Sequence, residues 1–217
     1  KLKVISSYAV GYNNIDVEYA TQLGIAVCNT PGVLTETTAD LTWALILASC
    51  RRISESERFV RNGNFKGWEP MLMLGLDVYE KTLGIIGMGR IGQAVAKRAT
   101  GFEMRIIYYN DVSLSQTLAF EAREVTLKTL LQEADIITLH LPLTKETFHL
   151  ISKEEFALMK ESAVLINTSR GAVIDEKELI KALKTKRIFA AGLDVYENEP
   201  YIPEELLALE NVVLLPH

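Results

Sequence analysis

The chain has 217 residues, of which 48% are hydrophobic and 24% charged, and its formal net charge is −5. This composition predicts an ordinary soluble globular protein of one or two domains and disfavours a disordered chain. The negative charge disfavours nucleic acid or an anionic membrane surface as the main partner.

The first predicted elements form a strand, helix, strand unit. VISS at 4–7 and IAVC at 25–28 are short apolar runs, and the stretch between them ends at Gly24, a residue suited to terminate a helix. A long helix is predicted from about Thr35 to Arg61, apolar early and charged late, and far too short in its apolar part to span a bilayer. Residues 63–81 are rich in glycine and lack a clean period, which predicts a linker or the flank of an active site.

Beyond residue 81 apolar runs alternate regularly with helical stretches such as 91–99 and 176–184. The alternation predicts an α/β fold with a doubly wound parallel sheet of the Rossmann type, covered by helices on both faces. The predicted strands are TLGII (82–86), MRIIYY (104–109), DIITLH (135–140), AVLIN (163–167), IFAAGLDV (188–195) and NVVLL (211–215).

The segment GMGRIG at 87–92 matches the pattern G-x-G-x-x-G between a predicted strand and a predicted helix. In this setting Gly87 would allow a tight turn, Gly89 the close approach of a pyrophosphate, and Gly92 the close packing of helix on strand. The amides of Arg90 and Ile91, at the positive end of that helix, would then face the phosphates. The sequence therefore predicts a dinucleotide site.

The end of the next predicted strand bears on the choice of coenzyme. A dinucleotide site of this type uses an acid roughly 20 residues after the glycine turn to bond the ribose hydroxyls. Asn110 stands at the expected place, and Asp111 follows it directly. Because a carboxylate repels a 2′-phosphate and neither position carries an arginine, NAD is favoured, with NADP as the alternative.

Charged or titratable groups follow three later strands, and these groups are Arg170, Asp194, Glu199 and His217. Since the carboxyl ends of parallel strands share one edge of the sheet, we expect these groups to converge on one crevice. They suggest hydride transfer at a 2-keto acid, in which Arg170 binds the carboxylate or the adjacent carbonyl, His217 protonates the carbonyl oxygen and Glu199 holds the imidazolium. Asp194 would orient the nicotinamide. Each residue alone also fits an ordinary surface or turn position.

The remaining titratable and aromatic residues carry weaker signals. His140 is interpreted as a structural histidine, with a place beside the adenine or the active-site crevice as its alternative, and His149 as a residue of a solvated or packed surface. Trp68 is interpreted as a packing residue, with a substrate or partner contact as its alternative. Cys28 and Cys50 lack the spacing of metal ligands, so we expect no metal site and a reduced, cytoplasmic protein.

Taken together, several segments resemble the D-isomer-specific 2-hydroxyacid dehydrogenase family, particularly its glyoxylate and hydroxypyruvate reductases. They are YAVGYNNID, NTPGVLTETTADL, TLGIIGMGRIGQAVAKRA, HLPLTKET, LINTSRGAVID, AGLDVYENEP and NVVLLPH. The resemblance spans the whole chain. It implies reduction of glyoxylate or hydroxypyruvate with NAD(P)H, and Arg170, Glu199 and His217 as the catalytic residues.

The resemblance also implies further contacts. The backbone around Val10 and Gly11 would bind the substrate carboxylate together with Arg170. Coenzyme contacts are implied for Arg90, Ile91, Asn110, Asp111, Leu141, Pro142, Thr168 and Asp194. The apolar face of the long helix suggests a homodimer, and the resemblance to the family implies the same. Glu103 departs from the family, which usually has glycine at that turn.

The family assembles a flavodoxin-like substrate domain from both ends of the polypeptide. We therefore expect residues 1–34 to be the remnant of a truncated substrate domain, residues 35–80 to form the crossing helix and linker, and residues 81–217 to form the NAD(P)-binding Rossmann domain. Segments of the substrate domain are expected to precede Lys1 and to follow His217.

Two alternatives stay open. A related dehydrogenase could act on another D-2-hydroxy acid, phosphoglycerate or phosphite, whereas Glu199, where formate dehydrogenases carry glutamine, argues against formate. In a different class, the fold could serve as an NAD-sensing binding protein similar to certain transcriptional corepressors.

Overall fold

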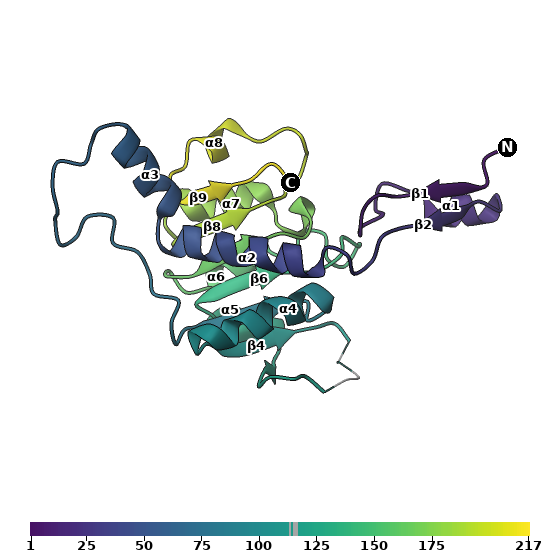
Figure 1. Ribbon diagram of the computed structural model, residues 1–217, viewed down its shortest axis with the longest axis horizontal. Coiled ribbons are helices and arrows are strands. Elements are labelled where there is room, and N and C mark those ends of the chain that lie inside the picture. The colour runs from purple at the N-terminus through teal and green to yellow at the C-terminus, as the bar shows by residue number, and fades with distance from the viewer. Residues whose placement is uncertain (113, 115–116) are drawn as a thin grey trace.

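The computed structural model describes residues 1–112, 114 and 117–217 and contains two parallel sheets of unequal size (Figure 1). The smaller sheet pairs β1 (Val4–Ser6) with β2 (Ala26–Cys28), joined through helix α1 (Val17–Gln22). The larger sheet has seven strands in the order β5-β4-β3-β6-β7-β8-β9. Its strands are β3 (Thr82–Ile86), β4 (Arg105–Tyr109), β5 (Arg123–Glu124), β6 (Ile136–Leu139), β7 (Val164–Asn167), β8 (Ala190–Leu193) and β9 (Val212–Leu214).

Helices cover both faces of the larger sheet (Figure 1). One face packs against α2 (Thr35–Cys50) and α4 (Arg90–Ala99), and the other against α5 (Leu127–Glu133), α6 (Lys153–Leu158) and α7 (Glu176–Lys184). The shorter elements are α3 (Ile53–Arg61), α8 (Glu204–Leu207) and two 3-10 turns, η1 (Thr100–Phe102) and η2 (Gly171–Val173). The predicted doubly wound parallel sheet is confirmed. None of the helices in the described part of the chain is long and apolar enough to cross a membrane.

The sheet is buried on both faces because its strands are apolar at nearly every position. Along β3, Ile85 packs with residues of α2 and α4, whereas its neighbour Ile86 packs with residues of α5, α6 and α7, and both are fully buried. Burial on both faces makes central parallel strands continuous hydrophobic runs. The runs of β3, β4, β6, β7, β8 and β9 are therefore visible in the sequence, whereas the exposed edge strand β5 has only Arg123 and Glu124 and gives no such signal.

The prediction of one helix over 35–61 is wrong, because the helix breaks between α2 and α3. Arg52 has a left-handed backbone with φ of 53°, which no continuous α-helix contains. The chain beyond α3 returns to this point, where the N–H of Leu76 donates to the carbonyl of Cys50 at 2.8 Å. The Arg52 guanidinium fixes the break by binding Glu55 at 2.6 Å. A backbone contact from a residue far along the chain thus ends a helix that the local pattern would continue.

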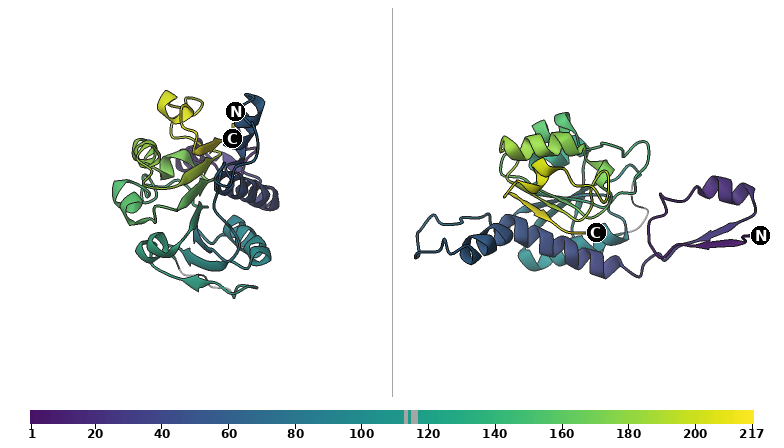
Figure 2. Two further views of the ribbon diagram at one scale, coloured as in Figure 1. Left: turned by 90° about the vertical axis from the view of Figure 1, so that its left-hand side faces the viewer. Right: turned by 90° about the horizontal axis from the view of Figure 1, so that it is seen from above.

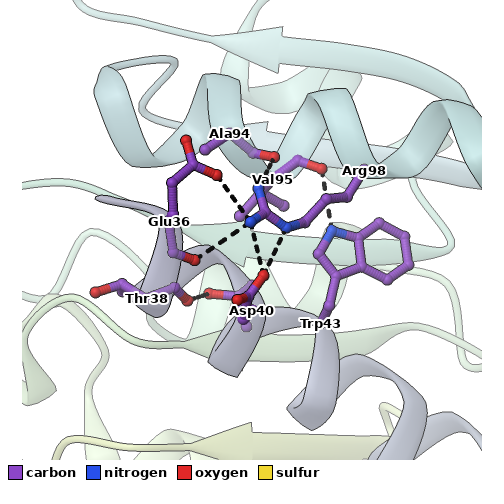
Figure 3. Close-up of polar contacts among 8 residues, drawn as sticks. Glu36, Thr38, Asp40, Trp43, Ala94, Val95 and Arg98 are labelled. Atoms are coloured by element: carbon purple, nitrogen blue, oxygen red, sulfur yellow. Dashed lines mark hydrogen bonds and ion pairs between the residues drawn. The ribbon is translucent and has the colours of Figure 1, made fainter. Parts of the chain in front are cut away.

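Ion pairs and hydrogen bonds join α2 to α4 (Figure 3). Arg98 donates from Nε to Asp40 at 2.8 Å and from Nη2 to the Glu36 carboxylate at 2.8 Å. Close by, the buried indole of Trp43 donates to the carbonyl of Val95 at 3.0 Å. The two acids are largely exposed, so the ion pairs contribute modestly, and the buried Trp43 bond supplies the fixed register between the helices.

Two parts of the chain project from the body at opposite ends (Figure 2). At one end lies the N-terminal unit of β1, α1 and β2, which includes the start of the chain. At the other end lie α3 and the loop that follows it, which we name the arm, residues 53–76. The apolar face of α2, in contrast, is covered by the chain's own sheet.

Asp135 gives the sheet a pH-dependent stability. Its carboxylate accepts from the N–H of Thr82 at 2.9 Å and from Lys160 at 2.7 Å. Burial alone would raise the pKa of Asp135, but these hydrogen bonds and the nearby lysine charges bring it below the ordinary value. A carboxylate whose pKa is lower in the folded state than in the unfolded state stabilises the fold. This stabilisation is complete above the unfolded-state pKa and is lost as the pH falls through the folded-state pKa.

We expect Asp135→Asn to lower the free energy of unfolding by about 1–3 kcal/mol at pH 7, because a charged acceptor with two donors is lost. The difference from the wild type should shrink as the pH falls below about 4, where the unfolded aspartate takes up its proton. Urea unfolding at several pH values measures both effects. Asp40→Asn, at an exposed ion pair, is the control and should cost less than about 1 kcal/mol. A difference that stays constant from pH 7 to about pH 3 would contradict this account.

Candidate active site

The glycine turn between β3 and α4 has the shape that a dinucleotide requires. Gly87 has φ of 97°, and a Cβ on it would lie 2.6 Å from the carbonyl oxygen of His140. A Cβ on Gly92 would lie 2.3 Å from the carbonyl oxygen of Gly87, so α4 can approach the turn only without a side chain there. Nothing stands within 4 Å of a Cβ position on Gly89, which precedes Arg90 and Ile91 and has no side-chain cap among the described residues. Free amides under open space at a helix N-terminus fit a pyrophosphate.

Asn110 supports this turn from the end of β4. Its Oδ1 accepts from the N–H of Met88 at 2.7 Å, and Met88 is fully buried inside the turn. The amide oxygen at the position expected for a ribose-binding acid is therefore committed to the protein's own backbone. Asp111 is exposed beside it, and its Oδ1 accepts from the N–H of Val112 at 2.9 Å. The exposed carboxylate of Asp111 is thus accessible to a ligand at this edge.

The neighbouring strand ends carry the other residues implied for the coenzyme. Leu141 follows β6, half-buried, and its Cδ2 would lie 2.9 Å from a Cβ on Gly87, while Pro142 is exposed. Thr168 follows β7, and its hydroxyl lies 3.0 Å from that of Thr42 in α2. Because the Thr42 hydroxyl donates its one proton to the carbonyl of Thr38 at 2.8 Å, it must accept from Thr168. The lone pairs of the Thr168 hydroxyl then face away from α2.

His217 and Glu199 come together beyond the ends of β9 and β8. Nδ1 of His217 lies 2.7 Å from Oε2 of Glu199, while Oε1 of Glu199 accepts from the N–H of Tyr196 at 2.9 Å. Burial by itself raises the pKa of Glu199, but the hydrogen bonds from His217 and Tyr196 and the charges of His217 and Arg170 bring it below its ordinary value. Glu199 is therefore an ionised acceptor at neutral pH.

Asp194 lies in the same group of side chains. Burial raises the pKa of Asp194, although the charge and backbone N–H of His217 act in the opposite direction. The structure thus brings Asp194, Glu199 and His217, from the ends of two adjacent strands, into one cluster at the carboxyl edge of the sheet.

Arg170 connects this edge to the N-terminal unit. Its Nη1 donates to the carbonyl of Ser169 at 2.6 Å, and its Nε donates to Oδ1 of Asn13 at 3.3 Å. A Cβ on Gly11 would lie 1.6 Å from Nη2 of Arg170, so only glycine leaves room for the guanidinium. The residues implied for substrate binding, Val10, Gly11 and Arg170, therefore lie side by side, and the carbonyl of Val10 is bound by Asn29 at 2.8 Å.

Asn13 is a site residue that the sequence motifs did not single out. Besides accepting from Arg170, it donates from Nδ2 to the carbonyl of Leu143 at 2.9 Å, beside the Leu141–Pro142 turn. One amide therefore links the N-terminal unit both to the guanidinium and to the loop after β6. Its sequence signal was its place two residues after Gly11 in YAVGYNNID.

The other histidines do not join the cluster. The Nε2 of His140 is buried without a hydrogen-bond partner among the described residues, and burial lowers the pKa of His140 to about 4. His149 stacks on Phe148 and lies 3.2 Å from Glu197. Trp68 is 81% exposed in the arm, so the expectation that it packs is wrong. Glu103 adopts φ of 52° at the turn where the family usually has glycine, and it accepts from the hydroxyl of Tyr79 at 2.9 Å.

The fold and the glycine turn together define a dinucleotide-binding protein of the dehydrogenase type. Comparison with known proteins makes this specific, because residues 43–217 match the family described as D-isomer specific 2-hydroxyacid dehydrogenase, NAD binding domain. The chain belongs to the D-isomer-specific 2-hydroxyacid dehydrogenase family.

Individual relatives agree with this membership. The chain is 59% identical to glyoxylate reductase of Thermococcus litoralis, over the whole of this chain and 67% of that protein. The crystal structure of the TT0316 protein from Thermus thermophilus matches with a TM-score of 0.93 and 49% identity, over 100% of this chain and 68% of that one. A third match is the structure of the NADPH-dependent glyoxylate/hydroxypyruvate reductase of Sinorhizobium meliloti in complex with NADP and malonate. Its TM-score is 0.91 and its identity 36%, and the match covers 100% of this chain and 67% of that one. The chain thus spans about two thirds of the length of the relatives it matches.

We expect Asn110→Ala to weaken NADH binding about tenfold, because the buried N–H of Met88 loses its acceptor and the glycine turn loosens, at a cost of about 1–2 kcal/mol. Asn110→Asp keeps an acceptor at the same place and should bind NADH within about threefold of the wild type. Fluorescence titration of the three proteins with NADH gives the dissociation constants. Equal affinities for the wild type and Asn110→Ala would show that the turn holds its shape without this bond.

Proposed function

We propose that the protein is an oxidoreductase that uses a nicotinamide coenzyme to reduce a small 2-keto acid, glyoxylate or hydroxypyruvate, to the 2-hydroxy acid. The observation that carries the proposal is the 2.7 Å contact between His217 and an ionised Glu199 at the edge of the sheet that also carries the glycine turn. The relatives named glyoxylate reductase support the choice of substrate.

The contact determines the state of the imidazole. Because an ionised Glu199 can only accept hydrogen bonds, Nδ1 of His217 carries a proton, and this N–H donates a hydrogen bond to Oε2. Nε2 is then the nitrogen that faces a substrate, and in the imidazolium it carries the second proton. Transfer of that proton to the carbonyl oxygen completes the hydroxyl group, and the resulting neutral imidazole is still held by Glu199. The coenzyme supplies the hydride that adds to the keto carbon.

Arg170 would bind the other end of the substrate. Its guanidinium is held from one side by the carbonyl of Ser169 and from the other by Asn13. A guanidinium presents a planar pair of donors that matches a carboxylate, and its charge also favours the developing oxyanion beside it. Gly11 lies against the same guanidinium, so the N-terminal unit would contribute backbone donors to the carboxylate.

NAD is the proposed coenzyme, with NADP as the alternative. The exposed carboxylate of Asp111 would accept from ribose hydroxyls and repel a 2′-phosphate. The free thiols of Cys28, exposed, and Cys50, buried, fit the proposed cytoplasmic location.

We further propose that the protein forms a homodimer through the arm. Its exposed hydrophobic residues include Ile53, Val60, Phe65, Trp68, Met71 and Leu74, which are 52–81% exposed. The arm projects away from the body (Figure 2). Those side chains are largely uncovered by the described part of the chain. Large exposed apolar patches of this kind mark protein–protein contacts. A second copy is the proposed occupant because two identical arms can pair symmetrically.

In the protein expressed from its complete reading frame, His217→Ala should lower kcat for glyoxylate reduction about 10²–10⁴-fold, because the proton donor is lost. The dissociation constant for NADH should stay within about twofold, since the glycine turn does not depend on this side chain. Stopped-flow and steady-state assays with glyoxylate, hydroxypyruvate and other 2-keto acids test these points. Tight NADH binding without turnover on any of them would favour a coenzyme-sensing protein.

For the dimer, we expect the double substitution Trp68→Glu and Met71→Glu to produce monomers, because two charges would be buried in an apolar contact. Leu207→Glu, at an exposed hydrophobic residue of α8 outside the arm, is the control and should leave the dimer intact. Sedimentation velocity at micromolar concentration distinguishes the two states. A monomeric wild type, or a double variant that stays dimeric, would refute the assignment of the arm.

A further inference from the structure

Tyr196 occupies an unusual place between the three segments that carry Arg170, Glu199 and His217. It follows β8 in the loop that leads to Glu199, and only 6% of its surface is exposed. Its side chain belongs to the hydrophobic core on the α5, α6 and α7 face of the sheet. Because Tyr196 is fixed in the core, it can hold the neighbouring residues Glu199 and His217 in fixed positions.

Two hydrogen bonds connect Tyr196 to Glu199 and to the strand exit that precedes His217. The N–H of Tyr196 donates to Oε1 of Glu199 at 2.9 Å, on the oxygen that does not bind the imidazole. The phenol donates to the carbonyl of Leu215 at 2.7 Å, and Leu215 is separated from His217 only by Pro216. The backbone of Tyr196 thus fixes the carboxylate, while its hydroxyl fixes the strand exit that carries the imidazole.

The third segment meets Tyr196 through its backbone. A Cβ on Gly171 would lie 1.9 Å from the carbonyl carbon of Tyr196 and 2.0 Å from its carbonyl oxygen. The residue after Arg170 therefore packs directly on the backbone of Tyr196, at a distance that only glycine allows. Burial raises the pKa of Tyr196 to about 12, and the nearby Asp194 adds to this, so the phenol stays a donor throughout the working pH range.

We infer that Tyr196 is a positioning residue, which holds the His217 imidazole in register with the Glu199 carboxylate through its hydroxyl bond to Leu215. The inference rests on the proposed function for its kinetic consequence, but not for its structural one. The ring alone fills the core, so the hydroxyl is the group that sets the place of the strand exit. The exit is also held by the N–H of Leu215, which donates to the carbonyl of Leu193 at 2.9 Å on the neighbouring strand. We therefore expect loss of the hydroxyl to shift the exit without detaching it from the sheet.

The test is Tyr196→Phe in the protein expressed from its complete reading frame. We expect kcat for 2-keto acid reduction to fall about 5–20-fold, while the KM for glyoxylate and the dissociation constant for NADH stay within about threefold, because only the proton donor is displaced. The matched control is Tyr108→Phe. Tyr108 is buried to a similar degree, and its hydroxyl binds Glu124 at 3.3 Å on another strand, so kcat should stay within about twofold.

A second readout needs no substrate. At a fixed pH, the ¹⁵N chemical shifts of the His217 imidazole should change in Tyr196→Phe and stay unchanged in Tyr108→Phe. Unchanged shifts in Tyr196→Phe, or a loss of kcat that is equal in the two variants, would overturn the role of Tyr196. A wild type that turns over no 2-keto acid would instead refute the proposed function and leave the spectroscopic test valid.

Two unnatural residues keep the test decisive if Tyr196→Phe does not fold. 4-Fluorophenylalanine at position 196 fills the volume of the hydroxyl without donating, and 4-aminophenylalanine donates from nearly the same place. We expect the amino variant to keep kcat within about threefold of the wild type and the fluoro variant to lose it. Equal activity in these two variants would also overturn the inference.

Discussion

The parallel alignment of the seven strands is the constraint on which the rest of the molecule depends. It places the carboxyl ends of β3, β4, β6, β7, β8 and β9 along one edge, so that residues from Gly87 to His217 lie at the same edge of the sheet. The alignment is stabilised by strands that are apolar on both faces and by helices that bury each face. The polar groups that would take part in chemistry are therefore confined to the turns just beyond the strand ends.

Those turns are held by backbone contacts rather than by side-chain charge alone. Asn110 binds the turn that carries Met88, Asn13 binds the loop after β6, and Tyr196 binds the exit of β9. Each of these contacts joins two separate segments, so the edge acts as one connected frame. In the proposed function, Glu199 and Arg170 would be held in place before a substrate binds, which would lower the reorganisation that the reaction requires.

The two projecting parts of the molecule contribute differently to this frame. The N-terminal unit reaches the frame through Gly11 and Asn13, both of which contact Arg170, so substrate binding in the proposed function depends on where that unit lies. The arm lies at the opposite end of the molecule (Figure 2). Its exposed apolar residues support the proposed dimer. In the proposed function, the two ends of the molecule would therefore serve separate tasks.

By itself, the sequence determined the alternation of strands and helices, the glycine turn at Gly87–Gly92 and the order of the polar residues beyond the strands. These features follow from local periodicity and from backbone geometry that only certain residues adopt. The tertiary structure alone decided the break at Arg52, the engagement of Asn110 with Met88, and the contacts of Asn13 and Tyr196. Each of these depends on a partner distant in the chain, and a one-dimensional pattern holds no information about which distant backbone group will lie within hydrogen-bonding distance.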